Sequence, residues 1–339
     1  MRKGLGLLLS GTLAFALAAC GSNTGGQPAA KTSNGGSTAK QEKTISLGLT
    51  QFVEHPALDS VRKGIVDGLA EAGYQDGKNL VIDYQNAHGD MSNTVSIAQK
   101  FASDKKDIVV AIATPSAQAA AKTIQDKPVV FSAVTDPVSA QLVGSLDKPD
   151  KNVTGTSDKL SMDKQLELIQ KFLPSLKKLG IIYTTSEVNS EVQVKEMEEA
   201  ARKKGIEVFK AGITSSNEVQ LAAQTLVDKA QAIFIPIDNT VVASVEGVLT
   251  PAQKAKIPVF ASDIDTVKRG AVATYGIDYY KVGKQTGEMV ARILKGQKVA
   301  DTPVEVTREV NLTIHEKAAA AFGLTLSDEL KNQAKEILK

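Results

Sequence analysis

Short apolar runs alternate with segments of helical periodicity from Thr44 almost to the end of the chain, and this alternation limits the folds open to it. The first half predicts strands at 45–50, 79–87, 107–113, 128–134 and 152–158, with helices at 57–72, 92–104 and 116–125. The second half predicts strands at 178–185, 206–213, 232–237, 258–262 and 270–278, with helices at 162–173, 190–204, 217–228, 241–256 and 279–294. Such alternation predicts parallel sheets joined by right-handed crossovers.

The two halves also echo each other. "IVVAIATPSA", a helix and "KPVVFSAVTD" in the first half correspond to "AIFIPIDNTV", a helix and "IPVFASD" in the second. A length of 339 residues suits two domains better than one core. We therefore expect an α/β fold of two doubly wound parallel-sheet lobes joined by hinge crossovers. Lobe 1 would span 44–157 and about 279–303, and lobe 2 would span 158–278 and about 304–339, although no pattern places 304–339 securely.

The N-terminus has the layout of a secretion signal. Arg2 and Lys3 precede an apolar stretch over residues 5–19 that is too short for a comfortable membrane span. It ends in "LAACG", which resembles the lipobox of bacterial lipoproteins, where the cysteine is lipidated and becomes the mature N-terminus. Cys20 is the only cysteine, so no disulfide can form within the chain.

Residues 20–43 are mainly Gly, Ser, Thr, Asn, Gln, Ala and Lys without periodicity, which is typical of a flexible tether. With 1–19 as a signal peptide, we expect a body anchored through lipidated Cys20 to the extracytoplasmic face of the bacterial plasma membrane.

Composition and motifs argue against several function classes. The formal net charge is only +2, aromatic residues make up 4% and Trp is absent, so we expect no nucleic-acid partner. No dinucleotide, triphosphate, zinc or serine-hydrolase motif is present, so we expect no cofactor, no metal and no catalytic residue. The three histidines, His55, His88 and His315, are far apart in sequence, and each is expected on the surface or in a loop.

Polar residues at the strand ends are the candidate binding site. Ligands of open parallel sheets bind outside the carboxyl ends of the strands, so two facing lobes would form a cleft walled by the residues that follow each strand. Small polar residues dominate there, without Lys or Arg. The candidate ligand-binding residues are Gln51, Thr114, Ser116, Thr135, Asp136, Ser157, Ser186, Asn189, Asp238, Asn239, Thr240 and Asp263.

Several motifs together resemble one family. "HPALDSVRKGIVDGL", "GKNLVIDYQNAHGD", "AIATPSAQAA", "VVFSAVTDPVSAQLV", "NVTGTSD", "TSEVNS" and "IPIDNTV" resemble the solute-binding lipoproteins of ABC importers, in the branch with tryptophan- and other aromatic amino acid-binding members. The resemblance covers about residues 44–320. It implies a periplasmic binding protein type I-like fold, a non-enzymatic monomer that docks on a membrane permease, and hinge crossings near 155–158, near 275–278 and after Pro303. It also implies an aromatic amino acid (Trp, Tyr or Phe) as the solute.

The cleft residues suit a zwitterion. Asp238 or Asp263, expected on neighbouring strands, would pair with the ammonium, with Asp238 favoured. Thr114, Ser116 and Thr135 with helix N-terminal N–H groups would hold the carboxylate. Asp136 has a plainer role as a cap because Pro137 suits the first helical position, and Asn239 or Thr240 would cap the helix near Val241. The candidates for an aromatic slot are Phe52, Pro115, Val134 and Tyr275.

Other functions stay open at this point. The same fold could bind a branched amino acid, a sugar or a nucleoside, although few aromatic residues are available to stack on a sugar. The protein could also be a surface sensor that signals to a partner. A cell-surface enzyme could use an acidic cleft formed by Asp136, Asp238 and Asp263.

Overall fold

The computed structural model describes residues 44–149, 151–307 and 309–339. The expected signal peptide, the tether and Cys20 lie outside the described residues. The described residues belong to one structural unit. Within the described ranges, no helix is both long enough and apolar enough to cross a membrane.

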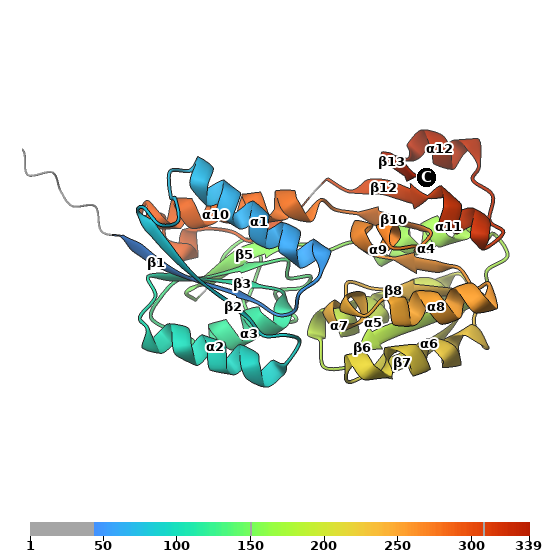
Figure 1. Cartoon of the computed structure of the whole chain (residues 1–339), viewed down its shortest axis with the longest axis horizontal. Helices are drawn as coiled ribbons and strands as arrows, with labels where there is room; N and C mark the ends of the chain where they lie inside the picture. The colour runs from blue at the N-terminus through green and yellow to red at the C-terminus, as the bar shows by residue number, and fades with distance from the viewer. Residues whose placement is uncertain (1–43, 150, 308) are drawn as a thin grey trace, which may run out of the picture. The chain divides into compact units, whose positions relative to one another are not determined.

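Lobe 1 is built on a six-stranded parallel sheet with the strand order β11-β5-β4-β3-β1-β2 (Figure 1). The strands are β1 (Ile45–Gln51), β2 (Leu80–Asn86), β3 (Ile108–Ile112), β4 (Val129–Ser132), β5 (Val153–Ser157) and β11 (Glu305–Val306). One face carries α1 (Pro56–Glu71) and α10 (Tyr279–Leu294), and the other carries α2 (Met91–Ser103) and α3 (Thr114–Thr123). Every residue of β3 is buried, as its apolar sequence predicts for a strand covered on both faces.

Lobe 2 contains a four-stranded parallel sheet in the order β7-β6-β8-β9. Its strands are β6 (Lys178–Thr184), β7 (Glu207–Ile213), β8 (Ala232–Ile235) and β9 (Val259–Ala261). Its helices are α4 (Met162–Phe172), α5 (Val188–Lys203), η1 (Ser216–Glu218), α6 (Val219–Val227), α7 (Asn239–Ala243), α8 (Glu246–Ala255) and α9 (Ile264–Lys268). The single helix expected at 241–256 is therefore two helices, α7 and α8, separated at Ser244 and Val245.

The C-terminal residues complete a third, mixed sheet. β10 (Ala273–Gly276) pairs antiparallel with β12 (Asn311–His315), which pairs parallel with β13 (Glu336–Leu338). This sheet departs from the all-parallel expectation. η2 (Val299–Asp301), α11 (Glu316–Ala321) and α12 (Asp328–Gln333) make up the remaining helical turns. Because β11 pairs with β5, residues 305 and 306 belong to the sheet of lobe 1, so assigning 304–306 to lobe 2 was wrong.

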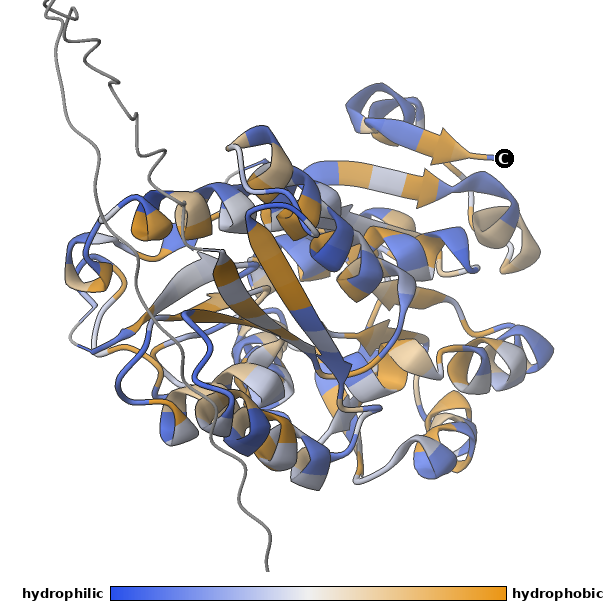
Figure 2. Ribbon diagram, turned by 60° about the vertical axis from the view of Figure 1, so that its left-hand side comes forward, coloured by the Kyte–Doolittle hydropathy of each residue, from blue (hydrophilic) through white to orange (hydrophobic). Residues whose placement is uncertain are grey.

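The two parallel sheets share one winding order. Leaving β11 aside, the first strand of each lobe lies between the second and third, so the strand order reverses between β1 and β3 and again between β6 and β8. Ligands of open parallel sheets bind at such switch points. Segments 158–161 and 277–278 connect the first sheet to the elements of lobe 2, and the chain passes from the first sheet to the third once more between β11 and β12. Hydrophobic residues concentrate on the strands and on the helix faces that pack against them (Figure 2).

Candidate ligand-binding site

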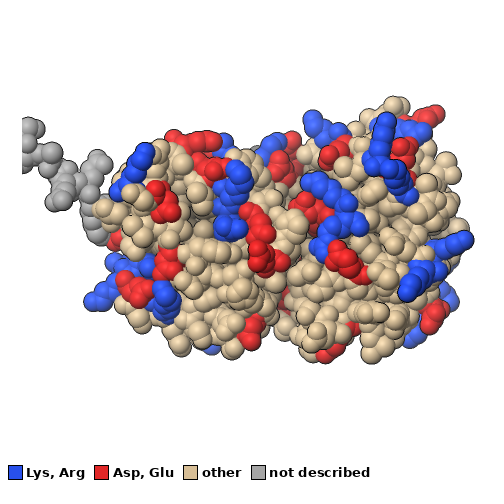
Figure 3. Space-filling model, in the orientation of Figure 1, with Lys and Arg blue, Asp and Glu red and all other residues tan. Residues whose placement is uncertain are grey.

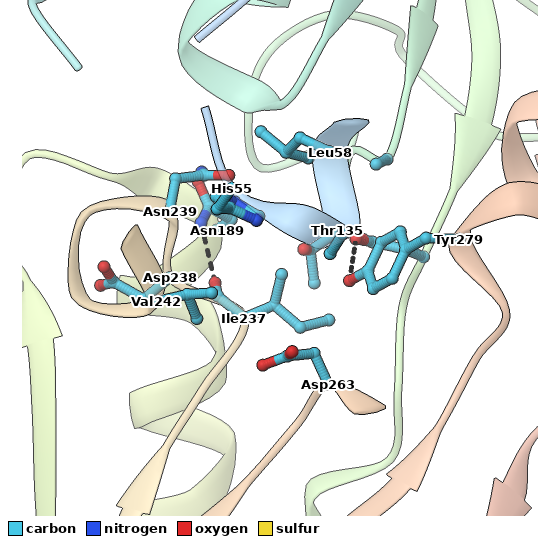
Figure 4. Close-up of a pocket in the computed structure, with 13 residues that line it drawn as sticks. His55, Leu58, Thr135, Asn189, Ile237, Asp238, Asn239, Val242, Asp263 and Tyr279 are labelled. Carbon is cyan, nitrogen blue, oxygen red and sulfur yellow. Dashed lines mark hydrogen bonds between the residues drawn. The ribbon is translucent and has the colours of Figure 1, made fainter. Parts of the chain in front are cut away.

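A cavity lies where strand ends of both lobes meet (Figure 4). The volume that a water-sized molecule can occupy there is only about 10 Å³, so the cavity is narrow. Lobe 1 and the connecting segment after β5 contribute His55, Ala57, Leu58, Ala133, Thr135, Asp158 and Tyr279. Lobe 2 contributes Asn189, Ile237, Asp238, Asn239, Val242 and Asp263. No Lys or Arg is among these lining residues, as the strand-end sequences predicted.

Buried polar atoms without a partner gather in this cavity. Within the described part of the chain, they are both ring nitrogens of His55, Thr135 Oγ1, Asp158 Oδ1, Asn189 Oδ1 and Asp263 Oδ2. Buried polar atoms in native proteins nearly always have a hydrogen-bond partner, so each exception needs an explanation. Three of the atoms are acceptors on carboxyl or amide groups, a set that suits a ligand with several N–H donors.

Asp158 is a buried carboxyl directly after β5, in the first connecting segment. Its Oδ2 accepts a hydrogen bond of 3.0 Å from the Tyr279 hydroxyl, and its Oδ1 has no partner among the described residues. Burial raises its pKa, while the Thr135 and Tyr279 hydroxyls act in the opposite direction. Asp158 was not among the predicted site residues, although its place immediately after a strand was a usable signal.

Asp263 keeps one oxygen free at the start of α9. Its Oδ1 accepts the Thr266 N–H at 2.7 Å and so caps that helix, whereas Oδ2 has no partner among the described residues. Burial raises the pKa of this carboxyl as well. Asp263 follows β9 and Asp238 lies three residues beyond the end of the paired strand β8, so the expectation that they lie on neighbouring strands is confirmed.

Asp238 is fully occupied by the protein, which corrects the expectation of a free carboxylate. Its Oδ1 accepts from Val241 N and Thr184 Oγ1, both at 2.8 Å. Its Oδ2 accepts from Thr184 N at 2.5 Å and from Ser190 Oγ at 2.7 Å. The carboxyl therefore caps α7 and joins it to β6 and α5. Asp238, and not Asn239 or Thr240, is the capping residue.

Glu187 is a second buried carboxyl behind the lobe 2 wall, and it had no role among the predicted site residues. Its Oε2 accepts from Asn189 Nδ2, Asn239 N and Asn239 Nδ2, and its Oε1 accepts from the backbone and hydroxyl of Thr240. Burial, followed by the nearby Asp238 carboxyl, raises its pKa to about 7. Glu187 therefore fixes the orientation of three predicted site residues without lining the cavity itself.

His55 lies in the loop between β1 and α1, one of the two expected positions, but it is buried and therefore not on the surface. It immediately precedes α1, after the carboxyl end of β1, and it is 7% exposed. Burial lowers its pKa to about 4, against the opposing effects of Asp59 and Asn239. His55 is the first residue of the motif "HPALDSVRKGIVDGL", but the resemblance assigned it no role. Its position shortly after a strand beside the switch point was a second usable signal.

Several buried hydroxyl groups follow or end the strands of lobe 1. Thr50, Thr114 and Ser116 have buried hydroxyls without a partner in the described chain, and the last two lie in the first turn of α3. They do not line the cavity. Ala113 (φ 73°, ψ 156°) and Ala133 (φ 54°) hold left-handed backbone conformations directly after β3 and β4. Such strain in non-glycine residues clusters at functional sites.

The remaining predicted site residues lie around the cavity. Thr135, Asn189, Asp238, Asn239 and Asp263 line it, whereas Ser186 and Thr240 line a neighbouring pocket. Gln51 donates to Val53 O and Asp59 Oδ1, and Ser157 donates to Thr135 O. Asp136 forms an ion pair with Lys159 at 3.1 Å and accepts the Ser139 N–H within a turn. No helix begins at Pro137, so Asp136 stabilises a turn instead of a helix.

The residues suggested for an aromatic slot do not line this cavity. Phe52 lines the neighbouring pocket that Ser186 and Thr240 share, and Tyr275 lines a third pocket beside Gln165. Pro115 is buried in the first turn of α3, and Val134 is buried directly after Ala133. The apolar wall of the cavity consists instead of Ala57, Leu58, Ala133, Ile237 and Val242.

The charged side chains of the described residues form no metal-binding cluster, and on the face in Figure 3 they form no patch of one sign. Among the described residues, no three His, Cys, Asp or Glu side chains are arranged to hold a metal ion. On the face shown in Figure 3, Lys and Arg side chains are interspersed with Asp and Glu. This mixture agrees with the small net charge of +2.

Comparison with known proteins decides the family. Residues 46–338 match the family model for ABC transporter substrate binding proteins. The chain belongs to the ABC transporter substrate-binding proteins. The substrate-binding protein is 45% identical to the tyrosine-binding protein of Clostridioides difficile (strain R20291) over 95% of this chain and 93% of that one.

Two solved structures extend the comparison. A domain from Streptococcus pneumonia in complex with L-Trp is 38% identical, with a TM-score of 0.85 over 87% of this chain and 100% of that one. A ligand-free, open substrate-binding protein with adhesive properties from Clostridium difficile is 46% identical, with a TM-score of 0.66 over 87% of this chain and 99% of that one. These findings confirm the family inferred from the sequence and the periplasmic-binding-protein fold. The family binds solutes outside the cytoplasm and serves ABC transporters, a role that involves no catalysis.

Proposed function

We propose that this substrate-binding protein captures an aromatic amino acid in the cavity between its lobes and delivers it to an ABC permease. The observation that carries the proposal is the pair of buried carboxyl oxygens, Asp158 Oδ1 and Asp263 Oδ2, that face a cavity lined by no cationic side chain. A buried carboxylate without a partner is costly, and a ligand ammonium would offset that cost. The relatives named for tyrosine binding and solved with L-Trp support the same ligand class.

The ammonium binds between Asp158 on the lobe 1 side and Asp263 in lobe 2. Each carboxyl uses one oxygen for a protein hydrogen bond and keeps the other for the ligand. Asn189 Oδ1 supplies a third acceptor in the same cavity. An ammonium has three N–H donors, so carboxyl and amide oxygens match its chemistry. Asp238 takes no direct part, because its oxygens already accept four hydrogen bonds.

The ligand carboxylate binds toward the strand ends of lobe 1. Thr135 presents its unpartnered hydroxyl in the cavity, after β4. Thr114 and Ser116 add buried hydroxyls in the first turn of the ten-residue helix α3. This helix follows β3, the strand that pairs with β4. The N-terminus of a helix favours an anion, because its N–H groups are unsatisfied and its dipole is positive there. No arginine is needed for this arrangement.

Capture involves closure of the two lobes. The L-Trp complex superimposes on this chain with a TM-score of 0.85, whereas the open, ligand-free structure reaches 0.66 despite its higher sequence identity. This difference supports a closed arrangement of the lobes here. It also agrees with the narrowness of the cavity, which an amino acid could enter only after the lobes separate.

Attachment to the membrane is a further part of the proposal. Cys20 carries the lipid, residues 21–43 act as the tether, and the protein works as a monomer on the extracytoplasmic face. The support comes from the sequence alone, since these residues lie outside the described chain. One acyl chain gives only marginal membrane binding, so a diacyl group is expected at Cys20.

Calorimetry on the purified body tests the ligand class. Wild type is titrated with tyrosine, tryptophan and phenylalanine, with leucine and glucose as unrelated solutes. Asp158→Asn and Asp263→Asn are titrated in parallel, and Asp126→Asn serves as a matched control because Asp126 is exposed and outside the cavity. We expect losses of about 2–5 kcal/mol in binding free energy for the cavity variants and none for the control. Absence of binding to all three aromatic amino acids would refute the proposal.

A further inference from the structure

The His55 imidazole is a polar ring that the fold buries at the cavity beside the Asn239 side chain, with no hydrogen bond of normal geometry from the described residues to either ring nitrogen. It lines the cavity, and it is 7% exposed. Its backbone carbonyl accepts the Asp59 N–H at 3.0 Å, so the main chain is tied to the first turn of α1. The backbone of His55 is therefore held in place, while its two ring nitrogens remain available to bind a ligand.

The ring is neutral at neutral pH. Burial lowers its pKa to about 4, and Arg269 acts in the same direction, while Asp59, Asn239 and Asp265 oppose the shift. A neutral imidazole offers one N–H donor and one nitrogen acceptor. The ring can therefore pair with a group that donates, accepts or does both, and it carries no charge that would attract the ligand carboxylate.

The position of His55 separates it from the groups proposed to bind the amino acid head. Thr135 follows β4 and Asp158 follows β5, whereas His55 follows β1, and β3 lies between β1 and β4. Two interstrand spacings correspond to about 10 Å. In Figure 4, His55 and Asn239 lie on one side of Ile237, and Tyr279 lies on the other. A ligand that reaches from Asp158 to His55 is therefore elongated, with a polar group at each end and an apolar middle.

We propose that His55 recognises the phenolic hydroxyl of a bound tyrosine and makes the protein prefer tyrosine to phenylalanine. This inference rests on the proposed function, capture of an aromatic amino acid. The phenolic hydroxyl both donates and accepts, so it can pair with either nitrogen of the neutral ring. Phenylalanine would leave the buried ring unpaired, and sites that hydrogen-bond a substrate hydroxyl discriminate strongly against analogues that lack it.

Affinity ratios test the proposal. The dissociation constants of tyrosine and phenylalanine are measured by calorimetry for wild type, for His55→Phe and for His88→Phe, a matched change at an exposed histidine of lobe 1 outside the cavity. His55→Phe should weaken tyrosine binding about 10- to 100-fold and leave phenylalanine binding within about threefold, so that the preference disappears. His88→Phe should keep the wild-type ratio. An unchanged ratio in His55→Phe overturns the proposal.

Wild-type protein provides a second test that does not depend on how a variant folds. With ¹⁵N-labelled histidine, tyrosine should shift the ring nitrogen resonances of one buried, non-titrating histidine, and phenylalanine should not. Equal shifts with both ligands overturn the role of His55. Equal wild-type affinity for tyrosine and phenylalanine also overturns it but leaves aromatic capture standing, whereas failure to bind any aromatic amino acid overturns the proposed function itself.

Discussion

Asp158 is a buried carboxyl beside the Tyr279 hydroxyl, and no Lys or Arg lines the cavity that it faces. The missing cation should make the carboxylate unfavourable for stability but favourable for binding an ammonium group. Burial raises its pKa, which means that the ionised form destabilises the ligand-free fold at neutral pH. Asp158→Asn should therefore raise the unfolding free energy of the ligand-free protein by about 1 kcal/mol or more while it weakens amino acid binding. Urea denaturation with and without tyrosine measures both effects. A variant that loses stability and binding together would indicate a purely structural role.

Glu187 predicts a pH dependence of stability whose sign follows from its raised pKa. Its folded pKa is about 7 and its ordinary value is 4.5, so the native state holds the proton more tightly than the unfolded chain. This contribution is fully present below about pH 4.5 and is lost as the pH rises to 7, a change of about 3 kcal/mol. Glu187→Gln should remove that part of the slope.

The measurement is the difference in unfolding free energy between wild type and Glu187→Gln at pH 5, 6, 7 and 8. The variant also loses hydrogen bonds to Asn239 and Thr240, so a constant offset is expected in addition to the slope. The titration of Glu187 is therefore measured by how the difference in unfolding free energy between wild type and variant changes with pH. A difference that stays constant from pH 5 to 8 contradicts the raised pKa.

For the polar residues, the sequence predicted several that line the cavity but not which carboxyl group is free. The rule that ligands bind beyond strand ends correctly directed attention to Thr135, Asn189, Asp238, Asn239 and Asp263, which all line the cavity. It could not tell which carboxyl would be free, because this depends on partners 48–54 residues away, such as Ser190 and Thr184 for Asp238. His55 was missed for the same reason: the elements that bury it come from both lobes.

At the level of elements, glycines allow helices α1 and α10 to pack closely. Gly64 and Gly68 on α1 face Gly283 and Gly287 on α10, and an added Cβ at Gly283 would lie 2.1 Å from Val61 O. The obstacle is backbone, which cannot rotate away. Gly283→Ala should therefore destabilise the protein by about 1–3 kcal/mol although alanine favours a helix over glycine.

Gly247→Ala on α8 is the matched control for this prediction. There the nearest atom to an added Cβ is the Val219 Cγ1 methyl at 3.0 Å, a side-chain atom that can shift slightly. We expect a smaller loss, or a gain from helix propensity. Urea denaturation of both variants gives the comparison, and equal destabilisation would count against close α1–α10 packing as the cause.

Elements were more predictable than their ends. The periodicity located the strands of both parallel sheets except β11. The central strands β3, β4 and β8 were the clearest, because a strand that is buried on both faces has a nearly continuous apolar sequence. It did not separate α7 from α8, since Ser244 and Val245 break the helix without a glycine or proline at that point. It also left β12 and β13 unplaced, because the pairing of β12 with β10 joins residues about 40 positions apart.

At the scale of the whole molecule, the N-terminus predicts attachment. Cys20→Ala should leave an uncleaved precursor or release the protein to the medium, because the residue that carries the lipid is gone. Cell fractionation and the mass of the purified protein measure this. Ser22→Ala, two residues further on, is the control and should be processed normally. Unchanged processing and membrane retention of Cys20→Ala would contradict the lipid anchor.

Closure of the lobes is the last expectation. Ligand that touches both Asp158 and Asp263 favours the closed state by its differential affinity for the two states, and only by that amount. Segments 158–161 and 277–278 should absorb the motion. Small-angle scattering of wild type should show a smaller radius of gyration with saturating tyrosine, whereas Asp158→Asn at the same tyrosine concentration should stay near the ligand-free value. An identical radius for wild type with and without tyrosine would mean a rigid, preclosed site, and the hinge segments would then serve only to connect the sheets.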